Sequence, residues 1–442
     1  MQMPLGALLD KLQNCPCGRR HTVDLEGVEV GRGLLSETAR LLHAYRFPRR
    51  LLVVADRNTL RAADGILDIL AQGGFAVQTL IYDDLRTAHQ KDVERVLSLC
   101  AETDGVLSVG TGSLNDICRR AAFLADRPFA IFATAPSMDG FASDTAPITD
   151  NNFKVSLPAR QPRVILADTD ILAAAPAELK SAGYGDMIAK YIAMADWRIA
   201  NLTIGEYICP QIADLTRDAV RRVVAMTDRV TANDAQTAGA ILEALVMTGV
   251  AMKLCGSSRA ASGAEHVVSH FWECKKLEQG LLSDFHGKKV GVASLMITRM
   301  YYDIIEKADP AEFAADDTDW PKVYGVYGSA FEQDVRRLNT PTVTDETSPD
   351  ILRENWDAIC AAVREEMPDP EALRSLLLRA GAATTLDEIT VSPELGLAGL
   401  QYHAYMRHRL TLARLLPMLR CPTDYPAWAG LTSAFYSTNS AL

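Results

Sequence analysis

Short hydrophobic runs alternate with longer helical stretches in the first part of the chain. The runs are rich in β-branched side chains and are bounded by glycine, proline or aspartate. They cover residues 51–55, 77–82, 105–110, 129–134 and 163–168. Runs of this length, separated by helical lengths, predict buried parallel strands. The alternation of strands and helices therefore predicts a doubly wound dinucleotide-binding domain over residues 1–170.

The hydrophobic pattern changes after about residue 170, where helical spacing dominates. Residues 216–227 and 234–254 are two examples of helical patterns, and few strand-like runs remain. Residues 171–442 are therefore expected to form a mainly α-helical second domain. Within it, residues 308–350 are acidic and contain several prolines, which predicts an irregular insertion. The expected fold class is α/β, with an N-terminal doubly wound nucleotide-binding domain followed by a mainly α-helical C-terminal domain.

The composition excludes several classes of partner. The chain has 442 residues, of which 48% are hydrophobic, so it can bury a large core. It contains no run of eighteen apolar residues and no basic start followed by an apolar segment, so neither a membrane span nor a secretory signal is expected. A net charge of −11 argues against nucleic acid as a partner. A cytoplasmic protein with a small-molecule partner is expected.

The nine cysteines are scattered and odd in number, so they do not predict a disulfide framework. Only Cys15 and Cys17 lie close together, in the sequence CPCGRRH that ends at His21. This cluster is either a small zinc site or a reduced segment with a structural role. No second ligand pair follows at zinc-finger spacing, so the sequence favours the structural interpretation.

A glycine-containing loop follows the strand predicted at residues 105–110. The sequence SVGTGSLND places Gly112 and Ser113 before a helix that Asn115 and Asp116 open. Glycine allows a phosphate to approach the backbone, and a helix N-terminus offers N–H groups to an anion. The third glycine of the G-x-G-x-x-G pattern is missing, so the loop is either a phosphate site or only a tight turn.

A second polar loop follows the strand predicted at residues 129–134. The sequence TAPSMDGFASDTAP places Thr134, Ser137, Asp139 and Ser143 at the carboxyl end of that strand. Ligands bind at this edge of open α/β sheets. Serine, aspartate and glycine also favour ordinary turns. Two such loops at adjacent strand ends favour a ligand site more than either loop alone.

Three of the eight histidines fall within one short window. Ser262 and Glu265 stand at capping-box spacing, which predicts the start of a helix. His266 and His270, four residues apart, would share one face of it. His286 is placed in a turn before the next predicted helix.

An aspartate upstream of this window is a candidate partner for the histidines. Asp186 is expected at the start of an apolar helix, where a carboxylate needs a partner. One carboxylate with two imidazoles suits a divalent transition metal that keeps open positions. Alternatively, Asp186 caps its helix and the histidines are satisfied polar residues. Spacing alone does not select the ligand pair, although i,i+4 spacing favours His266 with His270.

Together these motifs resemble those of one enzyme family. The segments GTGSLND, TAPSMDGFASD, GYGDMIAKY, SSRAASGAEHVVSHFWE and DFHGKKVG occur in the order seen in the sn-glycerol-1-phosphate dehydrogenases of bacteria and archaea. These belong to the iron-containing alcohol dehydrogenase and dehydroquinate synthase-like superfamily. The resemblance implies reversible reduction of dihydroxyacetone phosphate to sn-glycerol 1-phosphate with NAD(H) or NADP(H) and one divalent metal (zinc, nickel or iron). It also implies a homodimer and a role in phospholipid metabolism.

The same resemblance implies roles for individual residues. Asp186, His266 and His286 are implied as the metal ligands, which differs from the pair that helical spacing favours. Asp139, Asp186 and His270 are implied as catalytic residues in contact with the substrate. The implied nucleotide site comprises Asp56, which would lie near the adenosine ribose, and Gly112, Ser113, Leu114, Asn115, Asp116, Thr134, Ala135, Pro136, Ser137 and Ser143.

The phosphate of such a substrate needs cationic or N–H partners. Lys154 and Arg259 are the candidates, with the helix N-terminus at Ser262 as a third set of donors. Two other functions are considered. Dehydroquinate-synthase-like cyclases resemble one another in a glutamate where Asp186 stands, so this aspartate favours a dehydrogenase. A non-catalytic, ligand-binding family member would be expected to have lost a metal ligand or a glycine, and none is missing.

Overall fold

The computed structural model describes residues 5–431, which form two compact units. The first unit contains the residues up to 187 together with residues 209–258. The second contains residues 188–208 and the residues from 259 onward. The chain thus returns to its first unit after leaving it, and the unit boundaries do not coincide with residue 170.

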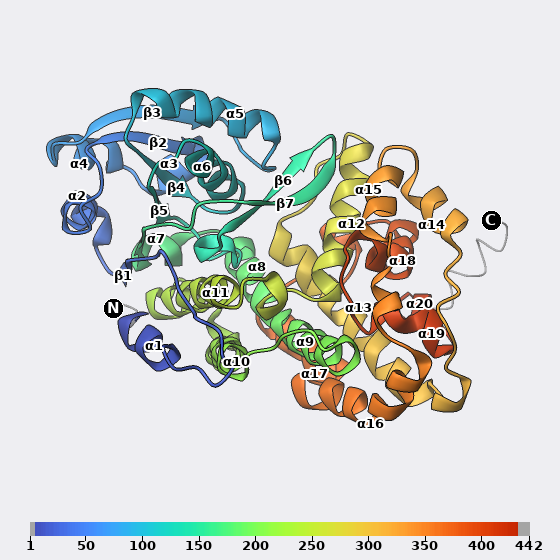
Figure 1. Cartoon of the computed structure of the whole chain (residues 1–442). Helices are drawn as coiled ribbons and strands as arrows, with labels where there is room; N and C mark the ends of the chain where they lie inside the picture. The colour runs from blue at the N-terminus through green and yellow to red at the C-terminus, as the bar shows by residue number, and fades with distance from the viewer. Residues whose placement is uncertain (1–4, 432–442) are drawn as a thin grey trace. The chain divides into compact units, whose positions relative to one another are not determined.

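A six-stranded parallel sheet forms the centre of the first unit (Figure 1). Its strands are β1 (Gly27–Gly31), β2 (Arg50–Asp56), β3 (Ala76–Tyr82), β4 (Gly105–Gly110), β5 (Phe129–Ala133) and β8 (Val164–Asp168), in the order β1-β8-β5-β4-β2-β3. The five predicted strands are confirmed. β1 is not predicted from the sequence because GVEVG is short and carries a glutamate. A separate antiparallel hairpin contains β6 (Thr145–Asp150) and β7 (Phe153–Pro158).

The order of the strands locates a ligand crevice at the sheet edge. From β2 the chain moves outward to β3, returns to β4 on the other side of β2, and continues to β5 and β8. The direction of winding therefore reverses between β2 and β4. Open α/β sheets bind ligands outside the carboxyl ends of their strands at such a switch point. The residues that end β2 and β4 are Asp56 and Gly110.

The central strands of the sheet are buried on both faces, which explains their continuous hydrophobic runs. Every residue of β4, β5 and β8 is buried. The helices of this unit are α1 (Leu5–Leu12), α2 (Leu34–Ala44), α3 (Arg57–Ala62), α4 (Ile66–Gln72), α5 (Gln90–Leu99), α6 (Gly112–Leu124), α7 (Thr169–Ala174), α10 (Pro210–Val224) and α11 (Ala235–Cys255), with nearly all of α8 (Ala177–Ile188). The helical patterns at 216–227 and 234–254 correspond to α10 and α11, which confirms both.

α11 is also apolar enough to be compared with a membrane span. Among residues 5–431 it is the one helix that is long and apolar enough to cross a membrane by length and composition alone. However, 78% of its apolar window is buried inside the protein. α11 lies beside α10 in the first unit (Figure 1), as a core helix does.

The second unit is helical throughout the part of the chain that the structure describes. Its helices are α9 (Lys190–Ile204), α12 (Ala264–Glu278), α13 (His286–Lys307), α14 (Trp320–Tyr327), α15 (Glu332–Leu338), α16 (Pro349–Glu366), α17 (Pro370–Arg379), α18 (Pro393–Tyr402), α19 (Leu416–Leu419) and α20 (Tyr425–Ala429). The prediction of an irregular insertion at 308–350 is wrong, because the helices α14 and α15 lie there. Pro321 occupies the first turn of α14, where a missing N–H costs nothing, and the Asp319 side chain caps that helix.

Candidate functional site

The glycine loop at the end of β4 has the backbone that close approach of a ligand requires. Gly112, the first residue of α6, has φ +48°, a value that favours glycine. A Cβ built at Gly112 would meet no atom within 4 Å, so open space lies in front of the loop. No side chain caps the N-terminus of α6. An uncapped helix N-terminus beside open space is a suitable place for a phosphate group.

The two polar loops predicted from the sequence lie side by side. The Thr111 and Ser137 hydroxyls are hydrogen-bonded at 2.8 Å, which joins the glycine loop to the loop after β5. Arg119, fully buried in α6, donates to the backbone carbonyls of Asn115 and Ser143 at 3.3 and 3.2 Å. This guanidinium therefore ties the helix that begins at the glycine loop to the second loop.

Asp56 at the end of β2 acts as a helix cap. Its Oδ1 accepts from the Thr59 backbone N–H at 2.8 Å, and the Thr59 hydroxyl accepts from the Asp56 backbone N–H at 3.0 Å. This capping box begins α3 and leaves Asp56 only 6% exposed. Contact of Asp56 with an adenosine ribose stays a prediction.

Asp139 and Asp186 lie in contact within the first unit. The Asp139 backbone N–H donates to Asp186 Oδ2 at 2.9 Å, and the Asp186 side chain is completely buried. Asp186 lies in the last turn of α8 and not at a helix start, so the alternative that it is a helix N-cap is wrong. One turn earlier, a Cβ on Gly183 would lie 1.9 Å from the Pro136 carbonyl oxygen. Glycine at 183 thus lets the second polar loop pack directly against α8.

The three predicted histidines lie together in the second unit. The ring centroids of His266 and His286 are 5.2 Å apart, and those of His270 and His286 are 5.7 Å apart. His266 and His270 are farther apart, at 6.5 Å. The i,i+4 pair on α12 is therefore less close than either pair that includes His286, the first residue of α13.

A buried glutamate orients His266, a role that the sequence reasoning missed. Glu265 Oε1 lies 2.6 Å from His266 Nδ1, and Glu265 is completely buried. A carboxylate accepts hydrogen bonds, so Nδ1 donates the proton, and in the neutral ring Nε2 then has a lone pair. Carboxylates that hold the second nitrogen of an imidazole are typical of metal-binding histidines. The sequence signal that could have predicted this role is the position of an acidic residue directly next to a candidate metal ligand.

The start of α12 differs from the expected capping box. α12 begins at Ala264, after the N-cap residue Gly263, so the N-cap is not the expected Ser262. Glu265 accepts from the Gly263 N–H, and Asp196 Oδ2 from α9 accepts from the Ala264 N–H, both at 2.8 Å. Burial raises the pKa of Asp196 to about 7. Through its bond to the Ala264 N–H, Asp196, which lies 68 positions upstream, holds the helical turn that carries His266.

An ion pair fixes α12 against α13, which carry the three histidines. Lys289 Nζ donates to Glu273 Oε2 at 2.9 Å, and both side chains are buried. Lys289 also donates to the Ser283 hydroxyl at 2.9 Å, in the segment that joins the two helices. Removing either charged partner would leave the other buried without its counter-charge, which is costly.

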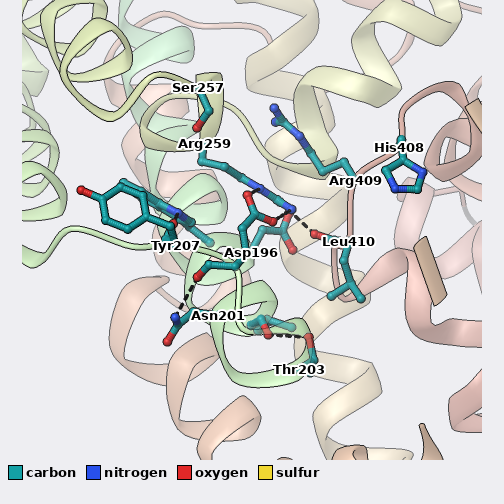
Figure 2. Close-up of polar contacts among 12 residues, drawn as sticks. Asp196, Asn201, Thr203, Tyr207, Ser257, Arg259, His408, Arg409 and Leu410 are labelled. Atoms are coloured by element: carbon teal, nitrogen blue, oxygen red, sulfur yellow. Dashed lines mark hydrogen bonds and ion pairs between the residues drawn. The ribbon is translucent and has the colours of Figure 1, made fainter. Parts of the chain in front are cut away.

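The candidate phosphate contacts lie in different units. Lys154, half-buried, lies on β7 of the first unit. Arg259 belongs to the second unit, where it donates to the Leu410 carbonyl at 2.8 Å (Figure 2). It also pairs with Glu206 at 2.5 Å. Arg409 is a further cation that the sequence reasoning missed, and it donates to the Ser262 carbonyl and hydroxyl at 2.7 and 2.9 Å. Phosphate binding by Lys154 and Arg259 stays a prediction.

Comparison with known proteins places these motifs among dehydrogenases. Residues 29–176 match the family model described as iron-containing alcohol dehydrogenase. A glycerol-1-phosphate dehydrogenase (NAD(P)+) from Geobacillus stearothermophilus is 28% identical over 425 residues, covering 94% of this chain and 96% of the relative. One of the same name from Geobacillus thermodenitrificans is 30% identical over 427 residues, covering 95% and 98%. The crystal structure of glycerol dehydrogenase from Schizosaccharomyces pombe shares the fold, with a TM-score of 0.60 at 16% identity over 93% of this chain and 88% of that one.

Substitution of Gly112 tests the glycine loop. In Gly112→Val we expect NADH to bind at least ~10-fold more weakly, a loss of about 1.4 kcal/mol or more. A branched side chain would occupy the open space and resist the positive φ. Titration calorimetry measures the affinity. Gly65→Val is the matched control, because Gly65 also has a positive φ and open space but lies between α3 and α4. Equal NADH affinity in the two variants would show that the loop is only a turn.

Proposed function

This chain belongs to the glycerol-1-phosphate dehydrogenase family, and we propose that it reduces dihydroxyacetone phosphate to sn-glycerol 1-phosphate, reversibly, with NADH or NADPH. It is a metal-dependent, NAD(P)-linked oxidoreductase of the iron-containing alcohol dehydrogenase type. The observation that carries the proposal is the group of three histidines on α12 and α13, one of them oriented by the buried Glu265. Such a group suits a catalytic metal site in a protein whose other unit has a nucleotide-type sheet.

We propose Asp186, His266 and His286 as the ligands of one zinc, nickel or iron ion. One carboxylate and two imidazoles are a donor set that these metals accept with positions left for substrate. Two observations support the fit. The buried carboxylate of Asp186 has one oxygen satisfied by the Asp139 N–H, and His266 directs the proton of Nδ1 to Glu265.

Different residues of the protein have different proposed roles in the reaction. A bound metal would supply Lewis-acid polarisation of the substrate carbonyl, and a bound nicotinamide would supply or accept the hydride. The Asp139 N–H holds the Asp186 carboxylate in place, and we propose that the Asp139 side chain contacts the substrate. His270, beside His286, is proposed to deliver the proton that the product hydroxyl needs. Lys154, Arg259 and the N-terminus of α12 are proposed to bind the substrate phosphate.

The nucleotide is proposed to bind at the switch point of the sheet. The N-terminus of α6, from Gly112 to Asp116, would receive the pyrophosphate. The loop residues 134–137 and Ser143 would border the nicotinamide side, and Asp56 would contact the ribose. The hydrogen bond between Thr111 and Ser137 supports a single site built from both loops. We further propose a homodimer, as the resemblance to the family implies, and a cytoplasmic location, as expected from the sequence.

The alternative of a cyclase is less well supported. Dehydroquinate-synthase-like cyclases use their NAD transiently and return it unchanged, whereas a dehydrogenase consumes NADH with each turnover. In a screen of small phosphorylated ketones we expect stoichiometric oxidation of NADH or NADPH, highest with dihydroxyacetone phosphate. Absorbance of the reduced nicotinamide follows the reaction. A protein that bound these ketones without net cofactor turnover would refute the dehydrogenase.

Two histidine substitutions test the division between metal ligand and proton donor. His286→Ala should lose one metal equivalent per chain, measured by elemental analysis, while its circular dichroism stays that of the native fold. His270→Ala should keep that metal and lose activity by about 10²- to 10⁴-fold in kcat, as expected for a general acid. His408→Ala, an exposed histidine of the same unit, is the control. Retention of the full metal content in His286→Ala would rule out the ligand assignment.

Substitution of Asp56 tests the choice of cofactor. The Asp56 carboxylate should repel the additional phosphate of NADPH, by about 1 kcal/mol in water at 4 Å. Arg57 could offset the repulsion, although it pairs with Asp83 at 2.9 Å on the surface. In Asp56→Ala the ratio of kcat/KM for the two cofactors should shift toward NADPH. Asp56→Asn should shift it as well while preserving the cap, because asparagine caps helices as well as aspartate does. An unchanged ratio in both variants would leave Asp56 as a cap only.

A further inference from the structure

We propose that Cys15, Cys17, His21 and Cys209 bind one structural zinc ion. The four ligand atoms all lie within 4.8 Å of one another. All four residues belong to the first unit, and none is part of the proposed catalytic site. The local CPCGRRH sequence supplies three ligands, and the fourth precedes α10, 194 residues after Cys15. The segment after α1 runs close to α10 in Figure 1.

The distances between the ligand atoms suit a tetrahedral ion. Zinc bonds of about 2.3 Å to sulfur and 2.0 Å to nitrogen separate tetrahedral ligand atoms by about 3.5–3.8 Å. Cys15 Sγ and Cys209 Sγ are 3.5 Å apart. His21 Nε2 lies 3.1 Å from Cys17 Sγ and 3.8 Å from Cys209 Sγ. Small adjustments of the side chains would therefore place four donors around one ion.

The hydrogen bond on the other side of His21 fixes the tautomer that a metal needs. His21 Nδ1 lies 2.7 Å from the Leu254 carbonyl oxygen. A carbonyl oxygen only accepts, so Nδ1 carries the proton and donates it. In the neutral ring Nε2 then has a lone pair, and it is Nε2 that faces the sulfurs. Histidine ligands of zinc commonly donate their other N–H to a backbone carbonyl in this way.

The local backbone brings the donors together, and three of the four donor residues are buried. Gly18 has φ +75°, and its N–H donates to the Cys15 carbonyl at 3.1 Å, so the chain turns tightly around Cys17. Cys15 and His21 are each 8% exposed, and Cys209 is fully buried. Cys209 is also the N-cap residue of α10, where the helix dipole stabilises negative charge.

The proposed ion would have a structural and not a catalytic role. Four protein ligands close the coordination shell, whereas catalytic zinc keeps one position for water or substrate. Through Cys209 and Leu254 the site would attach the N-terminal segment to α10 and α11. Two other interpretations are outcomes of the test: four neutral side chains packed without metal, and a disulfide between Cys15 and Cys209 in the isolated protein.

Cobalt substitution of the full-length protein separates this site from the catalytic one. Thiolate ligands give Co²⁺ a charge-transfer absorption in the near ultraviolet, which the proposed Asp186, His266 and His286 set cannot give because it contains no sulfur. We expect this absorption in the wild type and in His286→Ala, and its loss in Cys17→Ser. Cys17 is chosen because it is partly exposed, so serine there disturbs the packing little. Cys421→Ser, at a partly exposed cysteine of the second unit, is the control and should retain the absorption.

Metal counting and mass spectrometry complete the test. As isolated with zinc, the wild type should hold about two metal equivalents per chain, and Cys17→Ser and His286→Ala about one each. Absence of the charge-transfer absorption in the cobalt-loaded wild type would overturn the proposal, as would a metal-free protein with a Cys15–Cys209 disulfide. If the charge-transfer absorption is present but NADH oxidation is absent, the structural site stands and the proposed function fails. The structural zinc site and the proposed dehydrogenase function can therefore be refuted independently of each other.

Discussion

The cost of burying a carboxylate without a partner is the constraint on which the site depends. Asp186, Asp196 and Glu265 are all completely buried. The fold supplies each of them with at least one hydrogen-bond donor: the Asp139 N–H for Asp186, the Ala264 N–H and Tyr301 hydroxyl for Asp196, and the imidazole of His266 for Glu265 Oε1. These contacts set the backbone around the proposed ligands. The orientation of a proposed metal-binding imidazole is thus determined by the protein itself.

The nucleotide side is organised by a different constraint, the burial of a parallel sheet on both faces. Such a sheet leaves its functional groups at the carboxyl ends of the strands. At the reversal between β2 and β4 these ends carry the Asp56 cap and the Gly112 loop. The buried Arg119 donates to the carbonyl of Asn115 in α6 and to that of Ser143 in the second loop, so its guanidinium holds the helix and the loop together. Rigid loops at the sheet edge are what a cofactor site requires.

The cysteine cluster shows why the sequence spacing of ligands does not predict every metal site. Cys15, Cys17 and His21 lie together in the sequence. Because the sequence shows no fourth donor nearby, it favours a structural role for this segment over a zinc site. Cys209 completes the set only because α10 packs against the N-terminal segment. Zinc signatures identify sites whose ligands arrive in local pairs. A ligand supplied by a remote helix gives no such signal.

Local patterns in the sequence determined five of the six strands of the parallel sheet, because each strand buried on both faces must be continuously apolar. The strand at 105–110, in which every residue is buried, follows from such a pattern. Family resemblance, and not spacing, singled out His286 as a ligand. Only the tertiary structure decided the contacts between distant residues, such as the cap that Asp196 gives to α12. It also decided the return of residues 209–258 to the first unit. Such contacts depend on how the helices pack after they have formed. The packing partner of a segment cannot be identified from the hydrophobic periodicity of its sequence.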